Sequence, residues 1–297
     1  MNKDHIVLGN DIIAPRTEEV KRHKIQSEQI CSILEELARE QEKHSKAQNI
    51  ANCGTWLNFR QYHDEDNTRT LHSANFCKSP LCPMCAWRKA LKLTRQVGEA
   101  ILLSNKRYIY HVVMASDNTK QLTKDIITRF KANATRFIKK YLSDEYALAL
   151  EITYSEEKGF HPHVHAIVTS DTFIRVSAEY IKHIATMWAS YNKSIHPQNT
   201  FYITGITDRE KASRELTKYI LKYEGLDIAK DKEAIKDIAR ATAGLKKIQS
   251  AGKLLKDIAR TSKEYNQDRE RETKELEKYG YDLEIFNWVN GDYIKTN

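Results

Sequence analysis

The middle of the chain alternates between short apolar runs and longer stretches with apolar residues at helical spacing. Short apolar runs bounded by turn residues predict strands, and apolar residues recurring every three or four positions predict amphipathic helices. The expected strands are Tyr108–Ala115, Ala147–Tyr154, His163–Thr169 and Phe201–Ile206. The expected helices are Leu122–Leu142, Val176–Trp188 and Arg209–Tyr223. This order, βαββαβ followed by a helix, predicts an α+β fold of the ferredoxin-like (split βαβ) type. Helices are expected on one face of an antiparallel sheet, and the other face is left open for a site.

The regions on either side of this middle part have helical patterns. Apolar spacing predicts an amphipathic helix from about Thr17 to Ala47, and Ala239–Ala251 and Lys253–Thr261 are amphipathic as well. The mixed charges of Ser262–Tyr279 are typical of an exposed helix. We therefore expect four parts: an N-terminal helical segment (1–50), a cysteine-rich element with a basic helix (51–104), the α+β domain (105–225) and a C-terminal helical region (226–297).

The charge of the chain indicates a class of partner. Lys and Arg outnumber Asp and Glu by 48 to 40, and the isoelectric point is near 9.0. A basic balance favours an anionic partner such as nucleic acid, although ordinary basic proteins show an excess of this size too. No run approaches the ~20 apolar residues of a membrane helix, and the residues after Met1 do not open a signal peptide. We therefore expect a cytoplasmic protein without a membrane partner.

Four of the five cysteines cluster, and their spacing is typical of a zinc site. Cys82 and Cys85 are separated by two residues, so both thiolates can reach one tetrahedral ion. Cys77 and Cys53 can complete four sulfur ligands, which predicts a closed, structural Zn²⁺ site. His72 is an alternative to Cys53. A redox-active cysteine pair is an alternative to the whole site, although the βαβ context of such pairs is absent here.

The helix expected over Trp87–Arg95 begins at the cysteine cluster and has a basic face. Lys and Arg bind phosphates, but they are also the usual residues of an exposed helix surface. Both interpretations of this helix stay open.

A run of histidines leads into the third expected strand. Successive residues of a strand alternate between faces, so His163 and His165 point to one side while the apolar residues between and after them point into a core. Two imidazoles side by side can bind one divalent ion, and the alternative is a solvated strand end. In a regular hairpin, Glu151 is expected opposite His165 and on the same face, which makes it the candidate third ligand. His111 on the first strand is the reserve ligand.

The last helix of the middle part gathers groups that can act on a phosphodiester. Glu215, Tyr219 and Tyr223 are four residues apart and share one helix face, and Lys218 and Lys222 flank them. Nearby lysines would favour the anionic form of a tyrosine and would neutralise a phosphate. A divalent ion can polarise a phosphodiester, and a tyrosine can attack it to form a covalent phosphotyrosyl intermediate. The alternative is a helix whose tyrosines serve packing.

Taken together, these motifs resemble those of the HUH endonucleases, and within them the replication initiators of small rolling-circle plasmids in Gram-positive bacteria. The matching motifs are His161-Pro162, His163-Val164-His165, Glu215-x-x-x-Tyr219 and the cluster of Cys77, Cys82 and Cys85. The resemblance runs from about Cys53 to Tyr223. It implies Mg²⁺ or Mn²⁺ on His163 and His165, with Tyr219 as the nicking nucleophile. It also implies that Glu215 activates water in the terminating cleavage, and Tyr223 is the alternative as a second nucleophile.

The resemblance further implies the substrate and partners. Such initiators bind the double-strand origin of a plasmid, nick one strand to leave a 3′-hydroxyl primer and a 5′-phosphotyrosyl link, and terminate by a second cleavage. The expected partners are origin DNA, both duplex and single-stranded or hairpin, and a host helicase, and a homodimer is left open. The alternatives are an HUH relaxase or transposase, or a non-enzymatic zinc DNA-binding protein. A zinc hydrolase is the weakest alternative, because the histidine strand offers no Asp or Glu at the spacing that such sites use.

Overall fold

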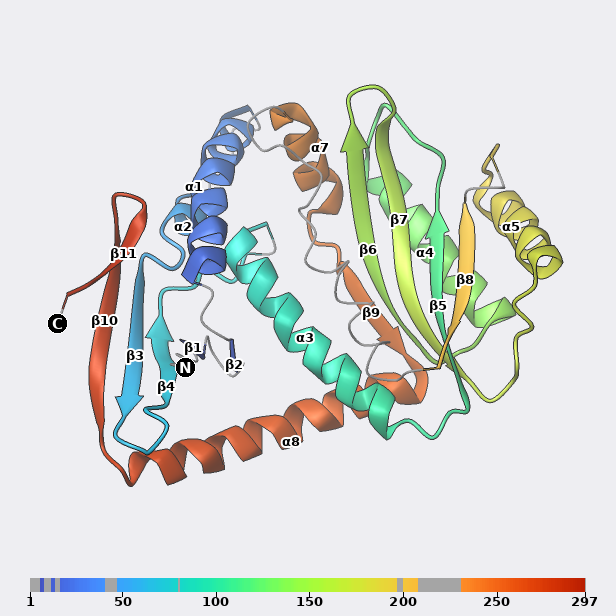
Figure 1. Cartoon of the computed structure of the whole chain (residues 1–297). Coiled ribbons are helices and arrows are strands. Elements are labelled where there is room, and N and C mark those ends of the chain that lie inside the picture. Colours follow the sequence, from blue (N-terminus) through green and yellow to red (C-terminus); the bar gives the residue numbers. More distant parts are fainter. Residues whose placement is uncertain are drawn as a thin grey trace. The chain divides into compact units, whose positions relative to one another are not determined.

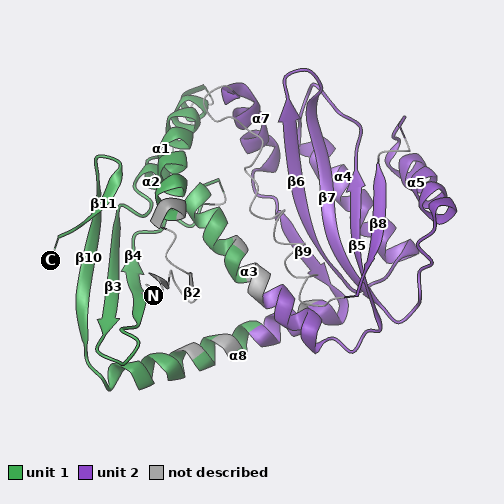
Figure 2. Cartoon of the chain, in the orientation of Figure 1, with its two compact units in different colours: residues 1–92, 262–297 green, residues 93–261 purple. Residues whose placement is uncertain are grey.

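The structure is a computed structural model that describes residues 6–7, 12–13, 17–40, 47–79, 81–196, 200–207 and 231–296. The chain forms two compact units (Figure 2): unit 1 comprises residues 1–92 and 262–297, and unit 2 comprises residues 93–261. The chain passes from one unit to the other within helix α3 (Pro83–Leu103) and again within helix α8 (Gly252–Glu277). The four-part division expected from the sequence follows motifs rather than compactness, and it stays a prediction.

Unit 2 is built on a five-stranded sheet in which every neighbouring pair is antiparallel (Figure 1). The strand order is β8-β5-β7-β6-β9. The strands are β5 (Tyr108–Ala115), β6 (Tyr146–Ser155), β7 (Gly159–Ser170), β8 (Phe201–Ile206) and β9 (Ile248–Ala251). β5 and β8 have the bounds expected from the sequence, whereas β6 and β7 are longer because their pairing continues to the turn. The α+β class is confirmed.

Helices α4 (Lys124–Tyr141) and α5 (Ala178–Asn192) cover one face of this sheet (Figure 1). Each begins at a hydroxyl cap: Thr123 Oγ1 accepts from the Ile126 N–H, and Ser177 Oγ accepts from the Tyr180 N–H. The core between helices and sheet includes Val112, Met114, Phe130, Phe137, Leu148, Val164, Ala166, Val168 and Trp188. Helix α7 (Lys232–Thr242) adds Ala234 and Ile238 to the same core. The residues that β5, β6 and β7 contribute to this core are the even-numbered ones, and β8 contributes Phe201 and Ile203, so each of these strands alternates as expected.

The opposite face of the sheet is covered at one end by the parts of α3 and α8 that belong to unit 2. This second core consists of Val97, Ala100, Ile101, Ile109, Ala147, Ala149, Ile167, Leu254 and Ile258. The expectation that this face would be open is therefore wrong at this end, because its odd-numbered strand residues are apolar and need a cover. Beyond the second core, the same face carries the polar residues of the candidate site.

The β6–β7 hairpin sets the register of that site. Ser155 pairs with Gly159, so the loop between the strands contains only residues 156–158, and Glu151 lies opposite His163. The expected pairing of Glu151 with His165 is wrong by two residues, because both strands continue further into the turn than expected; Ala149 is the residue opposite His165. A shift of two residues returns each side chain to the same face, so Glu151 and both histidines still share one face.

Unit 1 contains a six-stranded sheet of order β11-β10-β3-β4-β1-β2, antiparallel except for the β1–β4 pair. Its strands are β1 (Ile6–Val7), β2 (Ile12–Ile13), β3 (Trp56–Tyr62), β4 (Arg69–Ala74), β10 (Tyr281–Val289) and β11 (Asp292–Lys295). β10 pairs with β3 over seven residue pairs, so segments from the two ends of the chain lie side by side (Figure 1). None of these strands was expected from the sequence.

Three helical expectations need correction. The helix expected over Thr17–Ala47 is α1 (Thr17–Glu40), followed by a separate α2 (Ala47–Ala51). The expected helix Ala239–Ala251 ends early, because α7 stops at Thr242 and β9 follows. The C-terminal region is not wholly helical, since β9, β10 and β11 belong to it.

The helix expected over Arg209–Tyr223 lies outside the described residues, which resume at Asp231. Among the helices that the structure describes, none combines the length and the apolar character that crossing a membrane requires.

Candidate functional site

Strand β7 presents its histidines on the face of the sheet that lies away from α4 and α5. Val164 and Ala166 point to the other face, where both are fully buried in the core. His161, His163 and His165 therefore share a face, and their rings follow one another at centroid distances of 5.3 and 5.0 Å. Core packing on one side of the strand thus fixes the direction of three imidazoles on the other.

Glu151 on β6 meets two of these histidines. Its Oε2 atom lies 2.7 Å from His163 Nε2 and 3.1 Å from His165 Nε2. All three side chains are largely buried, with exposed fractions between 5% and 12%. One carboxylate oxygen and two imidazole nitrogens therefore converge from two adjacent strands, and one ligand atom from each residue lies within 4.8 Å of the others.

The other ring nitrogens of the two histidines have partners that orient the rings. His163 Nδ1 lies 3.0 Å from the carbonyl oxygen of His161, which can only accept, so Nδ1 carries the proton. His165 Nδ1 lies 3.4 Å from His111 Nε2 on β5, and these two rings are stacked at 5.6 Å. His111 thus contacts the far side of His165, and the described ligand group consists of Glu151, His163 and His165. Such outer contacts hold metal-binding imidazoles in place.

The protein environment favours the ionised form of Glu151. Burial by itself would raise the pKa of this carboxyl group, but hydrogen bonds and charge interactions with His163 and His165 outweigh burial and lower the pKa to about 2. The carboxylate is therefore a negative ligand throughout the physiological pH range. Two imidazoles and one carboxylate form a donor set that can hold a divalent ion, and a set of this kind does not select one ion by itself.

The four clustered cysteines of unit 1 also converge. One Sγ from each of Cys53, Cys77, Cys82 and Cys85 lies within 4.8 Å of the others. Cys85 Sγ is 3.5 Å from Cys53 Sγ and 3.7 Å from Cys77 Sγ. Sulfurs bound to one tetrahedral zinc at about 2.3 Å would stand about 3.8 Å apart, so the cluster has the dimensions of a zinc site. His72, the alternative ligand, lies exposed on β4 outside this group.

The backbone around the cysteines is arranged to support thiolates. The N–H groups of Cys77 and Lys78 donate to Cys53 Sγ and Cys85 Sγ at 3.4 and 3.2 Å. Hydrogen bonds from the other cluster sulfurs lower the pKa of the Cys82 thiol against the effect of burial. The Tyr293 hydroxyl of β11 donates to the Gly54 carbonyl at 2.6 Å, so the last strand of unit 1 braces the residue after Cys53.

The basic helix has one residue that is not a free surface cation. The Arg88 guanidinium lies 3.6 Å from the centre of the Phe76 ring, next to Cys77, which is a cation–π contact. Lys89 is exposed and Lys92 is half-buried. Among the described cations of this helix, Lys89 and Lys92 are the ones left to support a phosphate-binding interpretation.

The predicted tyrosine helix cannot be placed. Glu215, Lys218, Tyr219, Lys222 and Tyr223 all lie outside the described residues. Their roles stay predictions from the sequence.

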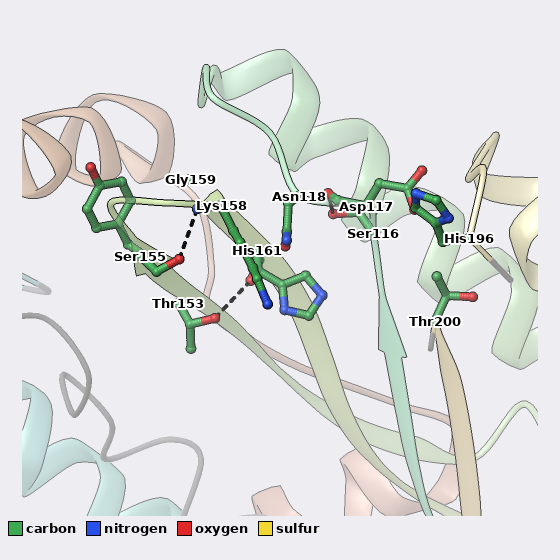
Figure 3. A pocket seen from close by; sticks show the side chains of 11 residues that line it. Ser116, Asp117, Asn118, Thr153, Ser155, Lys158, Gly159, His161, His196 and Thr200 are labelled. Carbon is green, nitrogen blue, oxygen red and sulfur yellow. Dashed lines mark hydrogen bonds between the residues drawn. The ribbon is translucent and has the colours of Figure 1, made fainter. Parts of the chain in front are cut away.

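One feature of unit 2 was not expected from the sequence: a cavity of about 390 Å³ next to His161 (Figure 3). Residues from three separate segments line it, among them Ser116, Asp117, Asn118, Lys158, His161, His196 and Thr200. Asp117 and Asn118 directly follow an expected strand, and polar residues at strand ends were the one available signal. His196 comes from a segment almost 80 positions later, so their meeting could not be read from the sequence.

Comparison with known proteins decides the family. A family described as "Replication protein" matches residues 68–292, which is most of the chain. The chain belongs to this family. The matched residues of this replication protein include Cys77, Cys82, Cys85, Glu151, His163 and His165, whereas Cys53 precedes them. The resemblance to plasmid replication initiators of Gram-positive bacteria is thereby confirmed.

Individual relatives are named "Protein rep". This replication protein is 24% identical over 235 residues to "Protein rep" of Lentilactobacillus hilgardii, covering 72% of this chain and 74% of the relative. It is 26% identical over 243 residues to "Protein rep" of Lactiplantibacillus plantarum, with the same two shares. It is 28% identical over 196 residues to "Protein rep" of Streptococcus pneumoniae, covering 61% of this chain and 58% of the relative. No solved structure matches this chain.

Proposed function

We propose that this replication protein initiates rolling-circle replication of a plasmid by binding the double-strand origin and nicking one DNA strand. The observation that carries the proposal is the convergence of His163 Nε2 and His165 Nε2 on one oxygen of Glu151. This group lies on the polar end of a sheet face, in a chain that belongs to a family of replication proteins. A divalent-ion site in a basic replication protein suits an enzyme that acts on a phosphodiester.

The topology of unit 2 supports an HUH-type nicking domain. Numbered within the expected βαββαβ core, the strand order β8-β5-β7-β6 reads 4-1-3-2, with α4 and α5 on one face. This order supports the ferredoxin-like arrangement proposed from the sequence, with β9 added at one edge. In it the histidine strand is central, so the candidate metal ligands stand on a rigid support rather than on a loop.

The proposed nick is a transesterification by Tyr219. The phenolic oxygen attacks the scissile phosphorus, a P–O bond forms to the tyrosine, and the P–O bond to the 3′ oxygen breaks. The departing 3′ oxygen takes up a proton and becomes the primer hydroxyl, while the 5′ phosphate stays linked to the protein. Lys218 and Lys222, on the same predicted helix, would favour the phenolate and neutralise the phosphate.

His163, His165 and Glu151 would hold a divalent ion, and His111 would keep His165 in position. When bound there, Mg²⁺ or Mn²⁺ would polarise the scissile phosphate and offset negative charge on its oxygens. The burial of these ligands would keep their geometry fixed while DNA enters and leaves.

The cysteine cluster is proposed to be a structural Zn²⁺ site in an element that contacts origin duplex. Closed four-cysteine sites stabilise small modules and leave no position open for a substrate. Lys89 and Lys92 follow the cluster on α3 and would contact phosphates. The competing function, a zinc DNA-binding protein without enzymatic activity, would use this element alone and leave His163 and Glu151 without a role.

A covalent-adduct assay tests the proposal. The protein is incubated with supercoiled plasmid carrying its origin and with Mn²⁺, and the protein linked to a 5′ DNA end is identified by denaturing electrophoresis and mass spectrometry. The native chain should yield nicked circles and one adduct on Tyr219. Tyr219→Phe should yield neither, since a phenyl ring has no oxygen to attack phosphorus, while duplex binding stays within twofold of the native chain. Cleavage without an adduct, or an adduct on another residue, would overturn the proposed nucleophile.

A further inference from the structure

The cavity next to His161 has no role in the nicking chemistry described above. Three segments build it: the loop after β5, the turn end of the β6–β7 hairpin, and the segment between α5 and β8 (Figure 3). About 390 Å³ in volume, it falls within the range of pockets that bind small organic groups. It lies on the described part of unit 2, on the same sheet face as the candidate metal ligands.

Hydrogen bonds hold the loop after β5 firmly on the hairpin. The Ser116 N–H donates to the Pro162 carbonyl at 3.0 Å, and Thr119 and Phe160 exchange two backbone hydrogen bonds of 2.8 Å each. Gly159 permits this approach, because a Cβ atom there would lie 2.4 Å from the Thr119 carbonyl oxygen. The wall formed by Ser116, Asp117 and Asn118 is therefore preformed.

Asp117 fixes the opposite wall. One of its carboxylate oxygens accepts from Ser194 Oγ at 2.6 Å and the other accepts from the Ile195 N–H at 2.7 Å. These bonds place His196 at the rim of the cavity (Figure 3). Because both oxygens of Asp117 are engaged by the protein, this carboxylate shapes the cavity rather than serving as the main contact for a ligand.

Two polar side chains in the lining of the cavity are available to contact a ligand. Asn118 and Lys158 line the cavity and point into it (Figure 3), and among the described residues neither side chain has a hydrogen-bond partner. An amide offers donors and an acceptor side by side, which is the pattern displayed by the edge of a nucleobase. The single ammonium group of Lys158 is offset by the carboxylate of Asp117, so the cavity is not an anion site.

The cavity lies next to the place where the scissile phosphate would bind. The His161 ring in its lining is 5.3 Å from the ring of His163, and His161 precedes His163 by one step along the same face of β7. We propose that this cavity binds the base and sugar of a nucleotide adjacent to the scissile phosphate, with Asn118 reading the base edge. The proposal rests on the proposed function, because it is the nicking reaction that brings a DNA strand to His163.

Binding of nucleotides tests the cavity directly. The probes are the four deoxynucleoside 5′-monophosphates, with deoxyribose 5-phosphate as the base-free reference, titrated into the full chain and followed by NMR or calorimetry. At least one nucleotide should bind with a Kd about tenfold or more below that of deoxyribose 5-phosphate. Asn118→Ala should raise that Kd about 5- to 30-fold, the range expected for losing one or two hydrogen bonds to a base. Gln121→Ala, an exposed amide on the same loop outside the cavity, should leave it unchanged.

Two results would overturn the proposal: equal Kd values for deoxyribose 5-phosphate and all four nucleotides, or an unchanged Kd in Asn118→Ala. Asn118 is exposed, so its truncation is compatible with folding, and circular dichroism checks this.

A second readout separates this proposal from the proposed function. Base selectivity in the titration needs neither Tyr219 nor a cut, so it is measured equally well in Tyr219→Phe. If the native chain forms no DNA adduct but nucleotide selectivity depends on Asn118, the proposed nicking function is wrong and the proposed nucleotide binding in the cavity is supported. If nicking proceeds and Asn118→Ala changes neither nucleotide binding nor the choice of nick site, the cavity proposal fails alone.

Discussion

Glu151 on β6 faces His163 on β7, and different neighbours set the protonation of each side chain. Glu151 is kept ionised by the two imidazoles, whereas His163 is kept in one tautomer by the carbonyl of His161. A metal ligand must release its proton before it binds the ion, so an incoming cation would displace the protons through which His163 Nε2 and His165 Nε2 contact Glu151, while Nδ1 of His163 keeps its proton. Substitution at either residue should therefore affect ion binding before it affects the fold.

Glu151→Gln removes the negative charge from the ligand group while keeping the size of the side chain. We expect affinity for Mn²⁺ to fall by about tenfold or more, because loss of a ligand has at least the effect of losing an outer-shell partner. Nicking should fall with it, and duplex binding should persist because it depends on basic contacts. Titration followed by electron paramagnetic resonance measures the affinity. Glu157→Gln, in the loop of the same hairpin, is the matched control, and an equal loss there would contradict the assignment.

Termination distinguishes two residues of the predicted tyrosine helix. If Glu215 is the general base that activates water, Glu215→Ala should still nick and form the adduct, yet fail to release unit-length circles. If Tyr223 is instead a second nucleophile, Tyr223→Phe should fail at release while Glu215→Ala releases normally. Two-dimensional gels of replication products from each variant decide between them. We expect the first outcome, since water needs only a base and Tyr223 lies one turn further along.

A comparison of Gly159 with Gly291 separates two contributions to the free energy of a Gly→Ala substitution: the unfavourable backbone conformation and the steric clash of the added Cβ atom. Both Gly159 and Gly291 have positive φ, of +81° and +86°, but only Gly159 has backbone atoms close to where a Cβ would stand. Gly291→Ala should cost about 1–2 kcal/mol from the left-handed conformation alone. Gly159→Ala should cost about 3 kcal/mol or more, because the Thr119 loop must move as well. Hydrogen exchange of the amides in each hairpin gives the two opening free energies, and equal values would exclude the steric contribution.

At the scale of elements, the cysteine cluster joins the turn between α2 and β3, the segment after β4 and the start of α3. Its four members lie in unit 1, and three of them come within nine residues of one another. An ion bound by all four would therefore add to the hydrogen bonds of Asn75, which already join the turn before β3 to the end of β4. The metal would contribute to folding of this element, as in other closed zinc sites.

Removing one of these ligands should release the metal and loosen unit 1. Cys85→Ser should lower the zinc content, measured by elemental analysis, from about one ion per chain to near zero, and strong chelation of the native chain should have the same effect. Cys31→Ser is the control, since Cys31 is buried in α1 outside the cluster and contacts Glu35. Native protein purified without zinc, with unit 1 intact by hydrogen exchange, would contradict a structural ion.

Elements whose own residues form a regular apolar pattern were the ones that could be predicted. β5 and β8 have the expected bounds, because each is an apolar run closed by polar residues. Glu151 was placed on the correct face although its register was wrong, since period-two alternation survives a shift of two. β3 and β10 were missed because each is mixed in polarity, with half-exposed residues, and their pairing joins positions more than 200 residues apart.

The same reasoning explains what was missed in the candidate site. The histidine group comes from one hairpin, and the residues that face each other in a hairpin can be predicted from their distance to the turn. The cavity beside it needs loops that follow β5 and α5, and hydrogen bonds of Asp117 to Ser194 and Ile195 determine where those loops meet. No periodicity in the sequence encodes such a contact, because it depends on where two helices have already packed.

At the scale of the whole molecule, the two units divide the proposed tasks. Unit 2 holds the histidine group and the cavity, and unit 1 holds the cysteine cluster. The chain has a net charge of +8, so its affinity for duplex DNA should depend on salt concentration whichever unit makes the contacts. Base-specific recognition, in contrast, would depend on short-range hydrogen bonds in unit 2.

Unit 1 is assembled from residues 1–92 and 262–297, and this determines the order in which the two units can complete their folding during synthesis. All of unit 2 has left the ribosome once residue 261 is free, whereas β3, which can pair with β4 early, must wait for β10 before its second ladder can form. At about 5–20 residues per second, that wait spans the translation of more than 200 residues. The four clustered cysteines are also synthesised long before β10, so metal ions in the cell can reach them before unit 1 is complete. A ribosome that stops before Tyr281 would release a chain that has its whole histidine sheet but lacks β10 and β11 of the unit 1 sheet, so an incomplete product would carry the proposed cutting centre with only part of the module that is proposed to direct it.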